Sequence, residues 1–310
     1  MILGTVIART LLLAATLGGA LLYGQDLTPK EKELVDAALP TKATVKPKKP
    51  RRMLITNLSM RDGQRFKSTS FAIRPIHNYA FDQMGKRTGA YEPVFNDDTE
   101  MFRPEKIKEF DAICFLNSSG VLFEDPELRK SLLDYIARGG GIVGIHDAIA
   151  TFVQWPKYDQ WPAFGQMLGG TENGGHLWNN EPITIRIDDR KSPLTAMFHG
   201  QEFAVTDQSF QLQEPGNLRE RLHVLTSIDV EKTPMKPTRK INPARAEDKD
   251  FPVTWIKSYG KGRVFYSALG HGAPVFSNPL LLQHFLAGIQ YALGDLKAND
   301  APTIKSAAKK

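Results

Sequence analysis

The 310-residue sequence contains one cysteine, which excludes an internal disulfide bond. Cys114 lies in the apolar run Ala112–Leu116, where a cysteine is expected to be a small, buried core residue. A cysteine nucleophile needs an exposed, electropositive setting, which this run does not offer. The fold must therefore be held together by its hydrophobic core, for which 41% hydrophobic residues are sufficient.

One apolar run, Leu11–Leu22, stands out near the start of the chain, after Arg9. It is shorter than the roughly 20 residues of a membrane span and ends in small residues, so residues 1–24 are predicted to be a cleaved signal peptide. An uncleaved N-terminal anchor is the alternative. The absence of a cysteine after the run excludes a lipoprotein anchor there. The protein is thus expected to be periplasmic or secreted, with no stable membrane span after cleavage.

The net charge of +6 does not extend over the folded part of the chain. Residues 25–52 carry eight Lys or Arg against four acidic residues, and residues 297–310 carry four against one. The rest is close to neutral, so no nucleic-acid-binding surface is expected. Residues 25–50 are predicted to be a basic, proline-bearing linker and residues 297–310 a disordered basic tail.

Two common catalytic motifs are missing. No glycine-rich phosphate loop follows the first predicted strand, since residues 57–65 contain one glycine. No Gly-x-Ser-x-Gly nucleophile elbow occurs, and the corresponding turn carries His146 in place of a nucleophile. Because histidine is a poor acyl acceptor, this argues against acyl-transfer chemistry.

The stretch Gly139–Asp147 is the feature around which the sequence is organised. A predicted helix over residues 125–138 begins with Asp125 and Pro126, and ends at Gly139. Residues 142–145 then form a short buried strand whose carboxyl end presents His146. In an open α/β sheet, ligands bind at the carboxyl ends of the strands.

Strands and helices alternate from residue 53 to residue 146. The predicted strands are residues 53–57, 91–95, 111–117 and 142–145, and the predicted helices are residues 70–84, 104–109 and 125–138. Pro93 favours an edge position for the second strand. This alternation predicts a parallel sheet with right-handed crossovers.

The pattern changes after residue 152. Trp155, Trp161 and Trp178 occur among glycines, which suits either a pocket wall or aromatic packing beneath a long loop. Residues 182–188 alternate like a strand, and residues 229–250 are predicted to be an exposed excursion. Residues 253–257 and 263–269 form a predicted hairpin, and a last helix extends from about residue 278 to residue 294.

Three histidines and one aspartate are the candidate site residues. His146 and His271 directly follow apolar strands, which suits acid/base catalysis or metal ligation. His176 lies between a pair of glycines and a tryptophan, and Asp207 follows a strand-like segment. The set His146, His176 and His271, with Asp207, could bind zinc. The other four histidines have weaker contexts, and His284, in the apolar last helix, is predicted to be structural.

Several segments together resemble the ThuA-like (trehalose utilization) family. They are residues 117–120, 139–146, 174–178 and 259–271, in colinear order within residues 51–296. The resemblance implies a flavodoxin-like three-layer α/β/α sandwich with a mostly parallel sheet, similar to class I glutamine amidotransferases. His146 stands where those enzymes have their cysteine.

The resemblance also implies a role in bacterial carbohydrate utilization. The expected ligand is a small sugar, a trehalose-like disaccharide or its 3-keto derivative made by a partner sugar dehydrogenase. By motif position, His146, His271 and Asp207 are the implied catalytic residues, and His176, Asn117 and Trp178 bind substrate.

The sequence also departs from the family pattern at several positions. Phe66 stands where relatives often have a histidine, and Ser192-Pro193 where a His-Pro is frequent. Gln208 and Phe210 replace a carboxylate and a phenol. These changes reduce the polar set expected of a family-type site.

These observations leave three functional hypotheses. The first is an exported enzyme that acts on a sugar or keto-sugar by histidine acid/base or metal-assisted chemistry. The second is a carbohydrate-binding or sensing protein that has lost catalysis, which the departures at Phe66, Gln208 and Phe210 motivate. The third is a zinc-dependent hydrolase.

Overall fold

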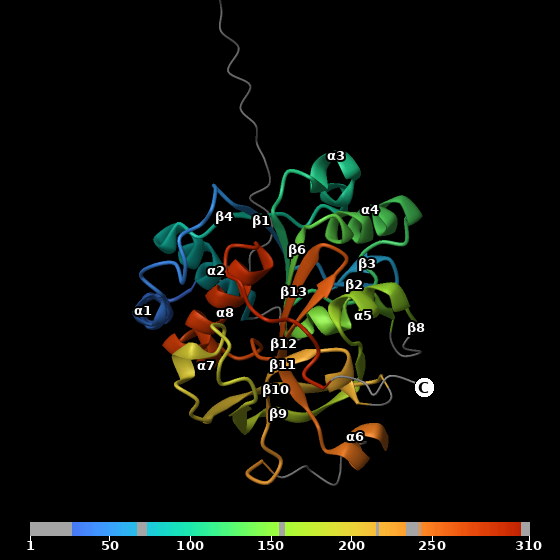
Figure 1. Cartoon of the computed structure of the whole chain (residues 1–310). Coiled ribbons are helices and arrows are strands. Elements are labelled where there is room, and N and C mark those ends of the chain that lie inside the picture. The colour runs from blue at the N-terminus through green and yellow to red at the C-terminus, as the bar shows by residue number, and fades with distance from the viewer. Residues whose placement is uncertain are drawn as a thin grey trace, which may run out of the picture.

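The computed structural model describes residues 27–66, 73–154, 159–214, 217–233, 241 and 243–304 (Figure 1). The predicted signal peptide, residues 1–24, and the end of the predicted tail, residues 305–310, lie outside this part of the chain. Within the described residues, no helix combines the length and the apolar character needed to cross a membrane.

A central sheet has the strand order β10-β9-β11-β12-β13-β6-β5-β1-β4. Its strands are β1 (Arg52–Thr56), β4 (Glu92–Phe95), β5 (Ala112–Leu116), β6 (Gly141–Ile145), β9 (Glu172–Ile187), β10 (Phe203–Leu212), β11 (His223–Ile228), β12 (Pro252–Tyr259) and β13 (Gly262–Ser267). Two short hairpins lie beside it, formed by β2 (Met60–Arg61) with β3 (Gln64–Arg65) and by β7 (Val153–Gln154) with β8 (Asp159–Gln160).

The strands β4, β1, β5, β6 and β13 are parallel neighbours. Counted along the chain they are the second, first, third, fourth and fifth parallel strands, which is the flavodoxin-like order. Every residue of β5 and β6 is buried, Cys114 included, which explains their continuous apolar sequences. The predicted fold class and the edge position of β4 are thus confirmed.

The strands β9 to β12 are inserted between the fourth and fifth parallel strands and extend the sheet antiparallel. The predicted hairpin is present as β12 and β13, paired from Thr254 with Ser267 to Tyr259 with Gly262. This hairpin returns the chain to the parallel half, beside β6. It therefore carries the segment after Ser267 to the same edge of the sheet as the end of β6.

Helices cover both faces of the sheet (Figure 1). One layer contains α1 (Pro29–Ala38), α2 (Arg74–Thr88), α7 (Ala273–Phe276) and α8 (Pro279–Ala292), and the other contains α3 (Pro104–Ile107), α4 (Pro126–Ala137) and α5 (Pro162–Leu168). Short 3-10 helices span Thr99–Phe102, His146–Ala150, Ala196–Phe198 and Leu218–Glu220. These layers confirm the three-layer sandwich.

Helix α2 lies further along the chain than predicted. It begins at Arg74, with Pro75 in its first turn, and ends at Thr88 before Gly89, whose φ is +63°. Gly89 is thus the left-handed stop signal that ends this helix. The shift places the first turn of α2, including His77, at the carboxyl edge of the parallel strands.

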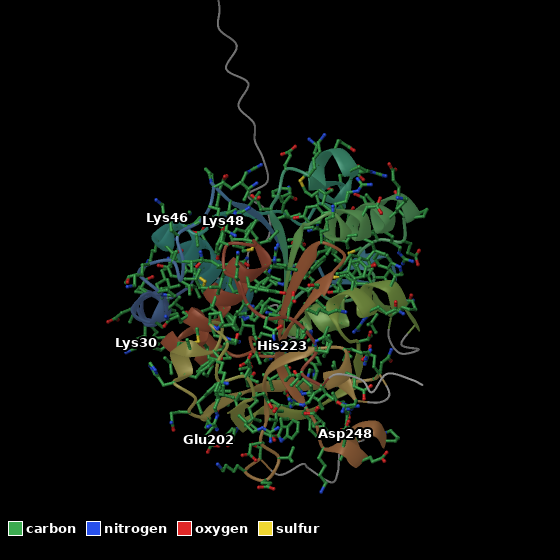
Figure 2. All side chains as sticks on the ribbon, in the orientation of Figure 1. Lys30, Lys46, Lys48, Glu202, His223 and Asp248 are labelled. Atoms are coloured by element: carbon green, nitrogen blue, oxygen red, sulfur yellow. The ribbon has the colours of Figure 1, made fainter. Side chains whose placement is uncertain are left out.

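Residues 25–50 were predicted to be a solvated linker, and the described part of this segment contradicts that. Thr28 and Glu31 form a reciprocal capping box at the start of α1, and Val35 is fully buried. The Gln290 side chain accepts from the Val45 amide at 3.1 Å and donates to its carbonyl oxygen at 2.7 Å. Composition misled the prediction because the lysines labelled in Figure 2, Lys30, Lys46 and Lys48, lie at the periphery.

The predicted disordered tail is also wrong for residues 297–304. The Thr303 amide donates to the Leu222 carbonyl oxygen at 3.0 Å. His223 Nδ1 lies 2.6 Å from the Ala301 carbonyl oxygen and Nε2 lies 2.8 Å from an Asp189 oxygen (Figure 2). The ring of His223 thus bridges the C-terminal segment and Asp189. These bonds attach the segment to β11.

The predicted exposed excursion, residues 229–250, is described in part. Helix α6 (Pro243–Asp248) lies here and is largely exposed. Its Arg245 is an exception, because it is fully buried with its guanidinium 2.9 Å from Asp248.

Candidate active site

His146 lies at the sharp turn between β6 and the short helix His146–Ala150. Its φ is +50°, in the left-handed region that few residues other than glycine occupy. Two contacts from the β13 side hold it, a hydrogen bond of 2.8 Å from the Tyr266 hydroxyl to the His146 carbonyl oxygen and one of 2.7 Å between His146 Nδ1 and the Ala268 carbonyl oxygen. A strained strand-to-helix turn is the geometry of a nucleophile elbow, here with a histidine in the nucleophile's place.

The three candidate histidines lie together. The ring centroid of His146 is 5.0 Å from that of His271 and 6.2 Å from that of His176, whose plane is tilted by only 8° from its own. Phe210 contacts both His146, at 4.7 Å, and His176, at 4.5 Å. The antiparallel strands β9 and β10 thus supply one wall of a site whose other wall comes from the parallel strands.

Burial keeps the central rings neutral. It lowers the pKa of His146 to about 4. It also lowers the pKa of His271 to about 4, assisted by the proximity of His146. At neutral pH each ring therefore has one nitrogen that donates and one that accepts. Asp147 Oδ1 lies 3.4 Å from His146 Nε2, where it would stabilise a proton taken up by that nitrogen.

Asp207 is fully buried beneath the His271 segment. Its carboxylate accepts from the backbone amides of Gly270 at 2.7 Å, His271 at 3.2 Å and Gly272 at 2.8 Å. Burial raises the pKa of this carboxyl to about 6, although the amide donors act in the opposite direction. With both oxygens occupied, Asp207 holds the backbone that carries His271.

Replacing Asp207 with alanine is expected to lower the free energy of unfolding by about 3 kcal/mol or more, because three buried amides lose their acceptor. Asp98→Ala is the matched control: this exposed carboxylate also accepts a backbone amide, from Glu100, and its loss is expected to cost about 1 kcal/mol or less. Urea denaturation measures both variants. Equal losses in the two would show that Asp207 does not hold the segment.

Asn117 and His77 complete the cluster, and His77 was not among the predicted site residues. Asn117 is fully buried with φ +56°, and its side-chain nitrogen donates to the Gly270 carbonyl oxygen at 3.1 Å and to His77 Nδ1 at 3.0 Å. Burial, and then the proximity of His146, lowers the pKa of His77 well below its usual value. Sequence context gave no signal for His77, since only the sheet topology brings the start of α2 to this edge.

Four polar atoms of the cluster are buried and have no hydrogen-bond partner within the described part of the chain. They are His77 Nε2, Asn117 Oδ1, His146 Nε2 and His271 Nδ1. Buried polar atoms in folded proteins are nearly always satisfied. Four such unsatisfied atoms lie at the carboxyl edge of the parallel strands, where ligands bind in flavodoxin-like sheets. They therefore indicate a binding site for a polar ligand.

Trp178 does not share the exposure expected of a pocket wall. Its indole is buried and meets the Phe251 ring edge to face at 5.2 Å. This is the packing alternative that the sequence left open. Among the departures from the family pattern, Gln208 donates to Asn179, and Phe66 lies against the Arg61 guanidinium, 4.4 Å from its ring centroid.

Zinc binding by His146, His176 and His271 stays a prediction. No three His, Cys, Asp or Glu side chains among the described residues are arranged to hold a metal. The ring planes of His146 and His176 are nearly parallel, with their centroids 6.2 Å apart. His146 Nδ1 is already occupied by a carbonyl oxygen.

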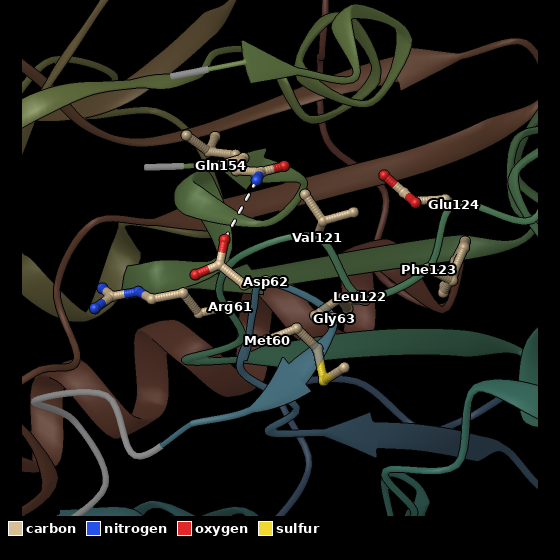
Figure 3. Close-up of a pocket in the computed structure, with 10 residues that line it drawn as sticks. Met60, Arg61, Asp62, Gly63, Val121, Leu122, Phe123, Glu124 and Gln154 are labelled. Carbon is tan, nitrogen blue, oxygen red and sulfur yellow. Dashed lines mark hydrogen bonds between the residues drawn. The ribbon is translucent and has the colours of Figure 1, made fainter. Parts of the chain in front are cut away.

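A cavity of about 510 Å³ lies at the same edge of the sheet (Figure 3). Its lining residues are Met60, Arg61, Asp62, Gly63, Val121, Leu122, Phe123, Glu124, Val153 and Gln154. They belong to the loops after β1, β5 and β6, which are joined by the bonds from Met60 N to Ser119 O and from Gly120 N to Ala150 O. The same loops carry Asn117 and His146.

Comparison with known proteins identifies relatives over most of the chain. The family model described as ThuA, trehalose utilisation, matches residues 66–292. A search of curated proteins finds no matching sequence.

Two solved structures share the fold. A ThuA-like protein from Bacteroides uniformis has a TM-score of 0.59 and 24% sequence identity, covering 79% of this chain and 93% of its own. A ThuA-like protein from Parabacteroides merdae has a TM-score of 0.56 and 16% identity, covering 81% of this chain and 93% of its own.

Proposed function

Because the chain belongs to the ThuA (trehalose utilisation) family, we propose that it is an exported enzyme that acts on a trehalose-like disaccharide or its 3-keto derivative. The observation that carries the proposal is the cluster of buried, neutral histidines with unsatisfied nitrogens. Such groups can exchange hydrogen bonds and protons with a polyhydroxylated ligand. Export rests on the apolar run in residues 1–24.

The reaction we propose is proton abstraction from the carbon next to a keto group. The proton moves from carbon to His146 Nε2, and the electron pair of the C–H bond forms the C=C bond of an enolate. The π electron pair of the C=O bond moves to oxygen at the same time. The imidazolium then exchanges its proton with solvent, and the return of a solvent-derived proton to carbon restores the keto group, so water is the only co-reactant. Asp147, 3.4 Å from Nε2, stabilises the charge that His146 carries in between.

The remaining residues have supporting roles in this proposal. His271 and His176 bind the ligand's hydroxyl groups beside His146, and Asn117 orients the opposite wall. Asp207 positions His271 through the backbone amides that it accepts. The keto group itself has to be made by a separate sugar dehydrogenase, because the proposed step neither oxidises nor reduces the sugar.

Calorimetry with trehalose and with 3-keto-trehalose tests the binding part of the proposal. We expect the keto-sugar to bind, and His146→Gln to weaken binding by no more than a few fold. NMR of the incubated mixture then shows whether the keto-sugar is turned over. Absence of both binding and turnover for either sugar would refute the proposed function.

The alternative is a carbohydrate-binding or sensing protein without catalysis. Phe210 favours it, because an apolar ring packs beside both His146 and His176, where a polar side chain could assist chemistry. Binding of the sugars without turnover, at every pH between about 5 and 8, would support this alternative.

A further inference from the structure

We propose that His77 is a second catalytic residue, which donates a hydrogen bond from Nε2 to the keto oxygen while His146 accepts the carbon-bound proton at Nε2. This inference rests on the proposed function. It names the residue that would stabilise the negative charge on the keto oxygen. The two rings would act as a complementary pair because their environments fix opposite tautomers.

The tautomer of His146 follows from its partner. Nδ1 lies 2.7 Å from the Ala268 carbonyl oxygen, which can only accept. The ring proton is therefore on Nδ1, and Nε2 presents a lone pair. Nε2 forms no well-aligned hydrogen bond within the described residues, with Asp147 Oδ1 3.4 Å away and the Gln208 side chain beside the ring. That lone pair is therefore the atom that we assign to the ligand.

The tautomer of His77 is the reverse. Its Nδ1 lies 3.0 Å from the Asn117 side-chain nitrogen, which can only donate. A flipped Asn117 amide is excluded, because the same nitrogen faces the Gly270 carbonyl oxygen at 3.1 Å and an oxygen there would be repelled. The ring proton of His77 is therefore on Nε2, which forms no well-aligned hydrogen bond within the described chain and has the backbone of His271 beside it. A ligand oxygen would have to compete with that backbone for the proton.

Burial makes both rings neutral, and neutrality suits both roles. Asn117 connects the two rings, because its side-chain nitrogen lies 3.0 Å from His77 Nδ1 and its backbone amide donates at 3.1 Å to the carbonyl oxygen of Ile145, the residue before His146. Burial, first of all, holds the pKa of His77 well below its usual value. A neutral imidazole still carries one N–H group. That group can donate a hydrogen bond to an enolate oxygen and so stabilise the negative charge that develops there. Phe276, whose ring centroid is 4.5 Å from that of His77, fixes the orientation of the ring.

Histidine ¹⁵N NMR of the full protein at neutral pH tests the tautomers without any substrate. We expect Nδ1–H in His146 and Nε2–H in His77, with signals assigned by their loss in His146→Gln and His77→Gln. His284 is an internal control, because its Nδ1 lies 2.6 Å from the Leu194 carbonyl oxygen and must show the Nδ1–H form. Identical tautomers in His77 and His146, or a charged ring in either, would overturn the proposal.

The catalytic role is tested by exchange of the keto-sugar's adjacent C–H in D₂O. We expect His77→Phe to lower the maximal rate about 100-fold or more, and His77→Gln, which keeps an N–H donor, to retain more of it. Thermal melts show whether either variant is folded. Wild-type exchange with an equal rate in a folded His77→Phe would refute the role of His77 and leave the proposed function intact, whereas no exchange by the wild type would refute the proposed function itself.

Discussion

His146→Gln is expected to lower the rate of C–H exchange in a 3-keto-disaccharide by about 100- to 10,000-fold, the usual contribution of a general base. The glutamine amide reaches the position of Nε2 but has no basic nitrogen there, and it does not replace the Nδ1 bond to the Ala268 carbonyl oxygen. The bond from the Tyr266 hydroxyl to the residue 146 carbonyl oxygen remains to hold the turn at the end of β6, and a thermal melt shows whether the variant is folded. In D₂O, the rate is measured from the decrease of the NMR signal of the proton on the carbon next to the keto group.

His199→Asn is the matched control for this variant. His199 is exposed and has a φ of +51°, a conformation that asparagine tolerates. Its rate is expected to equal that of the wild type. An unchanged rate in a correctly folded His146→Gln protein would show that His146 is not the base.

The free energy of unfolding is expected to fall as the pH is lowered from about 6.5 toward 4. Burial lowers the pKa of His146 and of His284 to about 4, against 6.5 for an ordinary histidine. The unfolded chain therefore takes up these protons first, and the stability present above pH 6.5 is lost as the pH falls toward 4. Each ring contributes roughly 3 kcal/mol to this loss.

Asp207 acts in the opposite direction over part of this range. Burial raises its pKa to about 6, so its protonation in the native state offsets part of the histidine effect. Urea denaturation at a series of pH values measures the net slope, and His284→Gln should flatten it by the share of one ring. A free energy of unfolding that stays constant or increases between pH 6.5 and 4 would contradict the buried, neutral state of these histidines.

The parallel half of the fold was predictable from local sequence. Residues 112–116 and 141–145 are apolar because both faces of β5 and β6 are buried, and glycine and proline mark the ends of the intervening helices. The sixteen-residue strand β9 was not predicted beyond residues 182–188, since its glycines and polar residues lack strand periodicity. The docking of α1 was missed because its few buried residues, such as Val35, are diluted by lysines.

The candidate site was predictable only where a residue follows a strand. His146 and Asn117 directly follow β6 and β5, so the parallel topology alone places them at one edge. His176 is brought to the same site by the pairing of β9 with β10. The sequence spacing of the histidines does not require that pairing. His77 depends on where α2 begins and on a hydrogen bond across forty residues to Asn117, and neither leaves a local pattern.

The most direct test of the central claim is NMR of a 3-keto-disaccharide incubated in D₂O with the wild-type protein. We predict that the proton on the carbon next to the keto group is replaced by deuterium far faster than in buffer, and that the acceleration disappears in His146→Gln. A wild-type rate equal to that of buffer alone, with the sugar bound, would contradict the account and leave a binding protein in its place.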